Sequence, residues 1–266
     1  MPELPEVETV RRGLSPLVCG RRIVSAGGHP SPKFAAASLA IGRTIIDVDR
    51  RGKYLLLGLD DKRRLVIHLG MTGQLRVDAT SAPPDPYDRA WWLFDDTRRL
   101  ALRDVRRFGR VAVVDQDLSA LPTLASLGPE PFDPAFTSEV LWASLRASTS
   151  RVKSQLLGQR VVAGVGNIYA DEALWRARIN PGARRISRPG ATRLLHALRE
   201  VLGEGIENGG TTLRDYRTID GGQGQNQHRL DCYGRAGQPC NRCGSTLRRA
   251  VLDARGTTWC PSCQAR

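Results

Sequence analysis

The sequence lacks any uninterrupted apolar run approaching the roughly 20 residues that a transmembrane helix requires. Its first ten residues, MPELPEVETV, contain three glutamates and no basic residue, so they do not have the form of a secretory signal peptide. Disorder is also disfavoured, because 41% of the residues are hydrophobic. We therefore expect a soluble, cytoplasmic protein that does not enter a membrane. Its 266 residues suffice for two domains, or for one large domain and a small module.

Lysine is scarce, since only four of the 40 basic residues are lysines. The chain nevertheless carries a net charge of +13, and the excess lies mainly in its second half. Residues 1–132 have 20 basic against 16 acidic residues, whereas residues 133–266 have 20 against 11. Such a field favours a polyanionic partner, because it speeds encounter and releases counterions. A solvated basic surface without a partner explains the charge almost as well.

Four of the six cysteines form the pattern Cys240-x2-Cys243-x16-Cys260-x2-Cys263. In a cytosolic chain this spacing indicates a zinc site rather than disulfides. Two Cys-x-x-Cys turns supply the four thiolates of a closed, tetrahedral, structural site. The tail is too short to bury much core, so we expect one structural zinc ion to stabilise it. Cys19 and Cys232 lie outside the pattern and are interpreted as small hydrophobic residues.

Hydrophobic periodicity predicts two kinds of structure. The face formed by Val7, Val10 and Leu14 predicts a helix over residues 3–14. Short apolar runs separated by turn residues then predict a β-sandwich or barrel; they span residues 54–59, 65–69, 90–94, 100–102 and 110–114. Beyond the break at residues 128–131 the period becomes helical, with helices expected over residues 138–145, 167–177 and 189–206. Ser138 is the expected cap of the first of these helices. The Gly- and Gln-rich stretch 221–227 is expected to be a flexible loop.

The amino terminus carries the pair Pro2-Glu3. A Met before Pro is normally removed, which leaves Pro2 with a free secondary amine. An α-amino group titrates at about pH 8, so a fraction of it is neutral and nucleophilic at pH 7. Attack on an aldehyde-like carbon gives an iminium ion that promotes eliminations, and Glu3 is placed to act as general acid. The alternative is that both residues only start a helix.

Lys53 is one of the few lysines and directly precedes a predicted strand. Arginine does not release a proton near neutral pH, whereas a partly buried lysine can. A lysine in such an arginine-rich chain therefore points to proton transfer, although chance is a fair competitor.

Two loop-like stretches combine apolar and basic residues. One is HLGMTG, with His68 and Met71, and the other is RRFG, with Arg106 and Phe108. Met and Phe on loops beside arginines suit a wedge that fills the gap left by a flipped base. Routine packing explains them equally well, and His68 alone is more typical of a hydrogen-bonded core residue.

Two further features suit phosphate contacts. Gly164 and Gly166 precede the predicted helix that starts at Asn167, so backbone N–H groups and the Asn167 cap could reach a phosphate. Lys153 either supplies charge to the same phosphate or is solvated. Residues 246–259 read as a β-hairpin with Arg255 near its tip, placed either to enter DNA or to face solvent.

Taken in order along the chain, these motifs resemble formamidopyrimidine-DNA glycosylases. The matching segments span residues 2–264: PELPEVETVRRGL, RRGKYLLL, IHLGMTG, DVRRFG, LGPEP, VAGVGNIYADEALW, GGTTLRDY, YGRAGQPC and ARGTTWCPSC. The resemblance implies an α+β, multidomain fold. Its parts are an N-terminal catalytic β-sandwich domain (residues 1–131), a helix–two-turn–helix domain (132–227) and a C-terminal zinc finger with four cysteine ligands (228–266).

The resemblance also implies a function and roles for individual residues. It implies a monomeric, nucleoid-associated base-excision repair enzyme that removes oxidised purines from double-stranded DNA and cleaves abasic sites. The implied catalytic residues are the nucleophile Pro2, the acid Glu3, Lys53 and Arg255. Implied DNA contacts are His68, Tyr87, Lys153, Asn167 and Tyr233, with Met71, Arg106 and Phe108 filling the void.

The sequence departs from the pattern of such relatives at three places. Tyr87-Asp88-Arg89 replaces a His-Asp-His element, Ser148-Thr149-Ser150 replaces a basic run, and Gly224-Gln225-Asn226 replaces a Gly-Tyr-Phe-like element in the lesion-capping loop. The last change bears on base preference more than on chemistry. Two alternatives stay open: an endonuclease VIII-like enzyme that prefers oxidised pyrimidines, and a non-catalytic zinc-finger protein that binds damaged DNA.

Overall fold

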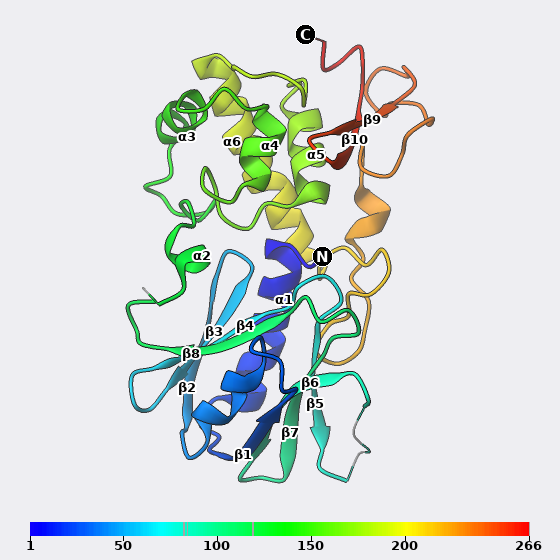
Figure 1. Cartoon of the computed structure of the whole chain (residues 1–266). Helices are drawn as coiled ribbons and strands as arrows, with labels where there is room; N and C mark the ends of the chain where they lie inside the picture. Colours follow the sequence, from blue (N-terminus) through cyan, green and yellow to red (C-terminus); the bar gives the residue numbers. More distant parts are fainter. Residues whose placement is uncertain (82, 84, 119, 266) are drawn as a thin grey trace. The chain divides into compact units, whose positions relative to one another are not determined.

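Contacts between Cα atoms divide the chain into two compact units (Figure 1). The computed structural model describes residues 1–81, 83, 85–118 and 120–265. The first unit comprises Met1–Ser126 and Asn208–Gln227, and the second comprises Leu127–Glu207 and His228–Arg266. Residues 208–227 therefore group with the N-terminal part of the chain, while the domain boundaries at residues 131 and 227 stay predictions.

Two antiparallel, four-stranded sheets form the first unit, which confirms the predicted sandwich. One sheet has the order β1-β6-β7-β5 and the other the order β2-β3-β4-β8. Their strands are β1 (Ile23–Gly28), β2 (Ile45–Arg51), β3 (Tyr54–Leu59), β4 (Arg64–His68), β5 (Gln74–Ala79), β6 (Asp88–Phe94), β7 (Arg98–Arg103) and β8 (Arg110–Val114). Both sheets contribute buried residues to a single apolar core, and Trp92 is among its largest members.

Three of these strands, β1, β2 and β5, are absent from the strand predictions. Each has at most two fully buried positions, and β1 ends in two glycines. In such strands the apolar signal is too short to stand out from loop sequence. The five predicted strands are all present, and residues 54–59 and 110–114 match β3 and β8 at both ends.

Helix α1 (Leu4–Val18) packs its predicted apolar face, Val7, Val10 and Leu14, into the same core. The short elements η1 (Ala35–Ala40), a 3-10 helix, and α2 (Pro122–Ala125) complete this unit. Helix α1 runs four residues beyond its predicted end, because Val18 continues the buried stripe past Pro16.

Helices dominate the second unit. They are α3 (Ser138–Arg146), α4 (Val152–Leu157), α5 (Asn167–Arg176) and α6 (Arg188–Glu207). The 3-10 turn η2 (Asn226–Arg229) starts in the first unit and ends in the second. The second unit also contains a hairpin of the strands β9 (Arg248–Leu252) and β10 (Arg255–Trp259). The predicted cap Ser138 is wrong by one residue: the Thr137 hydroxyl accepts from the Val140 N–H at 3.3 Å. Asn167 is likewise the first residue of α5, and Gly166 occupies the cap.

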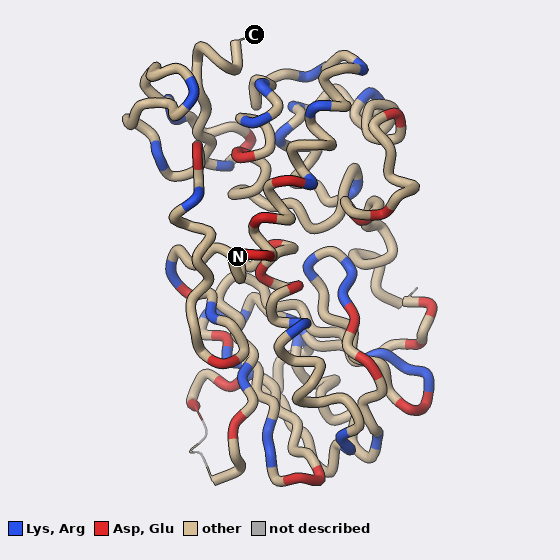
Figure 2. The backbone as a smooth tube through the Cα atoms, turned by 180° about the vertical axis from the view of Figure 1, so that it is seen from behind, with Lys and Arg blue, Asp and Glu red and all other residues tan. Residues whose placement is uncertain are grey.

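Charged residues of both signs are distributed over both units (Figure 2). Among the described residues, no helix is both long enough and apolar enough to cross a bilayer.

Glu8 is the centre of an ion-pair cluster that joins α1 to β2. Its carboxylate accepts from Arg11, Arg12 and Arg50 at 2.8–3.1 Å. Burial alone would raise the pKa of Glu8, but the three guanidinium groups outweigh burial and lower the pKa to about 2. Arg50 also donates to the carbonyl of Gly52 at 3.0 Å, so Glu8 fixes the β2–β3 turn against the helix.

Replacing Glu8 with Gln (E8Q) should lower the free energy of unfolding at pH 7 by about 2 kcal/mol, because three cations lose their counter-charge. Since the folded pKa of Glu8 lies below its unfolded value, the carboxylate stabilises the fold above pH 4.5. This stabilisation disappears as the pH falls to about 2. The difference between E8Q and wild type in chemical denaturation should therefore shrink over that range. A difference that does not depend on pH would contradict this account; E139Q, at an exposed ion pair, serves as control.

Candidate functional site

Pro2 and Glu3 lie buried at the start of α1. Glu3 caps the helix, and the Glu6 carboxylate accepts its N–H at 2.7 Å. The other oxygen of Glu6 accepts from the N–H of Thr211, also at 2.7 Å. Glu6 therefore bridges the helix start to the segment 208–227 and fixes the position of the two predicted catalytic residues.

Lys53 stands in the two-residue turn between β2 and β3, and its side chain is buried, with 6% exposed. His68 pairs with Tyr54 across β3 and β4, and the two rings lie 4.7 Å apart. Burial first, then the charges of Lys53 and Arg110, lower the pKa of His68 to about 4. Its Nδ1 accepts from the N–H of Gly70 at 3.1 Å, so at pH 7 the neutral ring carries its proton on Nε2. His68 is thus prepared to donate one hydrogen bond.

The loops that carry Met71 and Phe108 are fastened together by Asp104. One oxygen of this fully buried carboxylate accepts from the Thr72 hydroxyl at 2.5 Å, and the other accepts from the N–H of Gly109 at 2.6 Å. The Thr72 oxygen in turn accepts from the N–H of Arg106 at 3.2 Å. Asp104 therefore sets the distance between the two loops.

A close backbone contact adds to this fastening. Gly70 has φ +64°, and a Cβ at this position would lie 2.4 Å from the carbonyl carbon of Phe108. Only glycine therefore lets the loops approach so closely.

The predicted wedge residues present themselves to solvent. Met71 is 40% exposed and Phe108 is 47% exposed. The Arg106 guanidinium lies 4.7 Å from the Phe108 ring centroid. Lys33, which the sequence did not single out, lies 5.8 Å from the same centroid and donates to the Arg107 carbonyl at 2.9 Å. A wedge between bases requires exposed apolar side chains on loops of fixed position, and Met71 and Phe108 meet this requirement.

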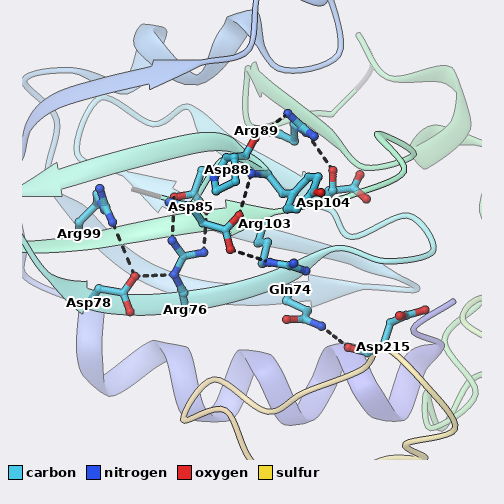
Figure 3. Close-up of polar contacts among 12 residues, drawn as sticks. Gln74, Arg76, Asp78, Asp85, Asp88, Arg89, Arg99, Arg103, Asp104 and Asp215 are labelled. Atoms are coloured by element: carbon cyan, nitrogen blue, oxygen red, sulfur yellow. Dashed lines mark hydrogen bonds and ion pairs between the residues drawn. The ribbon is translucent and has the colours of Figure 1, made fainter. Parts of the chain in front are cut away.

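The ring of Tyr87, in the element that replaces His-Asp-His, lies between two arginines. Its ring centroid is 5.6 Å from the guanidinium carbon of Arg89 and 5.1 Å from that of Arg103. Arg89 donates to the Asp104 carbonyl at 2.9 Å (Figure 3). The element Tyr87-Asp88-Arg89 is thus bonded to Asp104, the residue that connects the loops of Met71 and Phe108.

The strands beside it form a network of ion pairs (Figure 3). Arg76 bonds both oxygens of Asp88 at 2.7 Å and reaches Asp78 at 2.5 Å, while Arg103 bonds Asp85 at 2.8 Å. These carboxylates neutralise Arg76 and Arg103, so this part of the sheet offers a DNA phosphate fewer uncompensated cations.

The segment 221–227 is a loop, as predicted, up to the start of η2 at Asn226, and side-chain hydrogen bonds connect it to its neighbours. Asn226 is buried and donates to the Thr211 hydroxyl at 2.9 Å, and the side chain of Gln227 bonds both the N–H of Thr212 and the carbonyl of Gly224. A Cβ at Gly224 would lie 2.1 Å from the Gly210 carbonyl oxygen. The side chains of Asn226 and Gln227 thus form the hydrogen bonds that this loop makes with residues 211, 212 and 224, while Gln225 stays exposed.

In the second unit the carbonyl of Gly256 joins three predicted site residues. It directly follows Arg255 and accepts from Lys153 Nζ and from Asn167 Nδ2, each at 2.9 Å. Lys153 was expected to be solvated or to contact a phosphate directly. It is instead 1% exposed and pairs with Asp171 at 2.7 Å. The structure therefore gives Lys153 a supporting place under the hairpin, and its contact with DNA stays a prediction.

Arg255 is exposed and begins β10 opposite Leu252. The turn before it consists of Asp253 and Ala254, which both have positive φ. Asp253 bonds the side chains of Arg151 and Ser154, so the hairpin is held from α4 as well as through Gly256.

Tyr233 is half-buried, and its N–H donates to Glu172 at 2.6 Å. The same carboxylate accepts from the N–H groups of Asp231 and Cys232, both at 2.9 Å. Burial raises the pKa of Glu172 to about 7, while the three donors act in the opposite direction. Glu172 therefore anchors the segment that leads into the zinc module.

The four predicted cysteines come together. Their sulfur atoms all lie within 4.8 Å of one another, and Cys243 Sγ is 3.5 Å from Cys260 Sγ. A tetrahedral zinc ion with Zn–S bonds of about 2.3 Å would place its sulfurs about 3.8 Å apart, so the donor set fits zinc. Trp175 Nε1 donates to Cys240 Sγ at 3.4 Å. Cys232, buried in the same cluster, packs as a hydrophobic residue, as predicted.

Family models match three consecutive parts of the chain. They are the formamidopyrimidine-DNA glycosylase N-terminal domain (residues 1–111), the formamidopyrimidine-DNA glycosylase H2TH domain (127–217) and the zinc finger found in FPG and IleRS (237–266). A formamidopyrimidine-DNA glycosylase of Thermus thermophilus is 47% identical over 99% of this chain and 98% of its own length. This chain belongs to the formamidopyrimidine-DNA glycosylase family.

Other family members agree along the whole length. The Deinococcus radiodurans formamidopyrimidine-DNA glycosylase is 43% identical over 99% of this chain and 97% of its own. The crystal structure of the Thermus thermophilus protein, 47% identical, superposes with a TM-score of 0.92, covering 100% of this chain and 99% of its own. A Lactococcus lactis variant in complex with Fapy-dG-containing DNA is 35% identical, with a TM-score of 0.92 and coverage of 100% of both chains.

Sequence reasoning missed the buried carboxylates of this family member. Asp104, Asp171 and Glu172 are each at most 2% exposed. The adjacent acids Asp171 and Glu172 interrupt an otherwise apolar helix, and that interruption was the available signal. Asp104 gave no such signal, because it stands in a loop rich in charge.

Replacing Asp104 with Asn (D104N) should loosen both loops. Thr72 and Gly109 donate to different oxygens of Asp104, and the NH2 group that replaces one of these oxygens cannot accept a hydrogen bond. The lost bonds correspond to about 1–3 kcal/mol of local stability. Amide hydrogen exchange at residues 70–73 and 106–109 should accelerate roughly 5- to 150-fold accordingly. D96N, at the β6–β7 turn, should affect that turn and Arg21, with which Asp96 pairs at 3.1 Å, but not residues 70–73 or 106–109. Unchanged protection in D104N would remove Asp104 from this role.

Removing zinc should unfold the tail while leaving the sheets intact, because the metal supplies most of the stability of such a short module. With a chelator present, trypsin should cleave after Arg248 or Arg249, and added zinc should restore protection. Elemental analysis should give one zinc per chain, and C243S should reproduce the effect of the chelator. Equal resistance to trypsin with and without chelator would argue against a structural metal.

Proposed function

We propose that the chain is a bifunctional DNA glycosylase and AP lyase of base-excision repair, which removes oxidised purines such as 8-oxoguanine and formamidopyrimidines from duplex DNA. The observation that carries the proposal is the full-length similarity, at 47% identity, to a formamidopyrimidine-DNA glycosylase. Relatives in complex with DNA that contains Fapy-dG or carbocyclic 8-oxo-G support the lesion class. A relative bound to DNA with an AP site supports the lyase activity.

The first chemical step uses the two residues at the start of α1. Once Met1 is removed, the Pro2 nitrogen attacks C1′ of the damaged nucleotide, and the bond from C1′ to the base breaks. Glu3 delivers a proton to the sugar ring oxygen, which opens the ring. Lys53, buried in the β2–β3 turn, contacts the lesion or its phosphate. The product is an iminium ion between Pro2 and the opened sugar.

Eliminations then cut the strand. The iminium ion acidifies the C2′ proton, and its loss expels the 3′-phosphate. A second elimination expels the 5′-phosphate and leaves a one-nucleotide gap. Arg255, on its clamped hairpin, binds a phosphate during this last step. Zinc holds the tail's fold when bound and takes no part in bond-breaking.

Duplex binding requires the nucleotide to leave the stack. Met71, Arg106 and Phe108 fill the vacancy, while His68, Tyr87, Asn167 and Tyr233 contact the backbone, and Lys153 supports that contact from beneath the hairpin. The net charge of +13 favours this polyanion. We further propose that the enzyme works as a monomer in the cytoplasm, associated with the nucleoid through DNA.

Borohydride trapping tests the nucleophile. Wild type should form a covalent adduct with an 8-oxoguanine duplex. In P2G the yield of this adduct should fall at least about 100-fold, since the primary amine of glycine is less suited to the iminium chemistry. K53R should still trap on a preformed abasic site, because no base needs to depart there. The purified protein should also have the mass that lacks Met1.

Two results would overturn the assignment of Pro2 as the nucleophile. One is trapping by P2G that is as efficient as trapping by wild type. The other is loss of trapping on the preformed abasic site in K53R while P2G still traps there. Cleavage of thymine glycol in preference to 8-oxoguanine opposite C would place the activity with the endonuclease VIII-like alternative, for which the exposed Gln225 loop leaves room.

A further inference from the structure

A basic groove of about 940 Å³ lies within the second unit, beside the hairpin. Its basic lining residues are Arg151, Arg184, Arg185 and Arg248, and the described residues that line it include no Asp or Glu. The remaining wall contains Trp259, Leu252 and the segment 180–182. None of these residues has a part in the mechanism above. We call this site the hairpin groove.

Two of its arginines are held in place by backbone carbonyls. Arg184 donates one Nη to the carbonyl of Thr149, and Arg185 donates one to the carbonyl of Arg146, each at 2.7 Å. A guanidinium group has five N–H donors, so most remain available after one bond. Anchoring reduces the side-chain entropy lost when an anion binds. These two groups are therefore better prepared for phosphate oxygens than mobile surface arginines.

The hairpin presents only one of its faces to the groove. Arg248, Ala250 and Leu252 line it, whereas Arg249 and Val251 are exposed but do not. This follows from the alternation of side chains along strand β9. Of these two neighbouring, exposed arginines, Arg248 therefore faces the groove and Arg249 does not.

Arg151 connects the groove to the tip of the hairpin. Arg151 lines it and bonds Asp253, which stands two residues before Arg255. Trp259 adds an aromatic surface on which a sugar or base can pack. Since Asp253 compensates the charge of Arg151, the cations that the groove offers a phosphate are Arg184, Arg185 and Arg248. Cations along a groove with an aromatic wall are the features that bind a nucleic-acid strand.

We propose that the hairpin groove is an accessory site that binds a phosphodiester strand of DNA. The inference rests on the proposed function in that DNA is the substrate, but it concerns binding outside the lesion. The strand is either the flank of the lesion duplex or a separate DNA segment, and both present the same phosphates.

The matched pair R248Q and R249Q tests the groove. Fluorescence anisotropy with an undamaged duplex of about 40 base pairs gives the Kd at several salt concentrations. R248Q should weaken binding roughly 5- to 10-fold near 0.1 M salt and reduce the salt slope by about 1, as expected for one lost phosphate contact. R249Q should change the Kd less than about 2-fold. R184Q/R248Q should reduce the slope by about 2. Circular dichroism confirms the fold of each variant.

Duplex length distinguishes the two sources of the strand. If the groove binds the lesion duplex itself, R248Q should weaken binding to a long lesion duplex but not to one that ends a few base pairs from the lesion. If it binds a separate segment, wild type saturated with the short lesion duplex should capture a labelled second strand, and R248Q should not.

Equal losses in R248Q and R249Q would overturn the proposal, because the effect would then be that of overall charge. No loss in either variant would overturn it as well. Excision is measured separately on the short lesion duplex with wild type. Absence of excision there would contradict the proposed function while leaving the binding comparison intact.

Discussion

The ion pair between Glu8 and Arg50 is the interaction on which the arrangement of the first unit depends. Glu8 belongs to the helix that begins with Pro2 and Glu3, and Arg50 belongs to the strand that leads into Lys53. Because Arg50 also bonds the Gly52 carbonyl, a single carboxylate relates the helix to that turn. Catalysis by positioned groups depends on such relations, since small displacements cost large factors in rate. The proposed chemistry thus relies on residues that have no assigned contact with DNA.

Buried carboxylates repeat this device elsewhere in the chain. Asp104 collects a hydroxyl and an N–H from two loops, and Glu172 collects three consecutive N–H groups ahead of the zinc module. In each case the acid satisfies backbone groups that lie outside regular structure. A buried backbone N–H without an acceptor is costly. These acids therefore let irregular loops keep a defined shape, and irregular loops carry most of the proposed DNA contacts.

Much of the fold was predictable, because its strongest signals are local. The apolar runs of β3 and β8, the helical stripe of α1 and the cysteine spacing each express a short-range rule, and each led to the correct element. Strands β1, β2 and β5 escaped prediction because their stability comes from neighbours in the sheet, which composition does not show.

For the candidate site, the limit was the same. The types of residue suggested chemistry, but burial decides what each does. Lys153 reads as a surface cation, and only the folded chain shows it paired with Asp171 beneath the hairpin. The composition of residues 221–227 predicts a loop, but it does not predict the hydrogen bonds that the side chains of Asn226 and Gln227 form with Thr211 and Gly224. Contacts between residues far apart in sequence carry no local pattern.

The turn of the zinc-module hairpin bears on the phosphate contact proposed for Arg255. Asp253 and Ala254 adopt left-handed backbone angles without being glycines, with φ values of 47° and 61°, a conformation that costs on the order of 1 kcal/mol for each residue. Side-chain bonds to Asp253 hold one end of the hairpin, and the cysteine cluster closes the other. The entropy cost of ordering the hairpin backbone is therefore incurred during folding, so the DNA strand that Arg255 is proposed to contact does not have to order this turn when it binds.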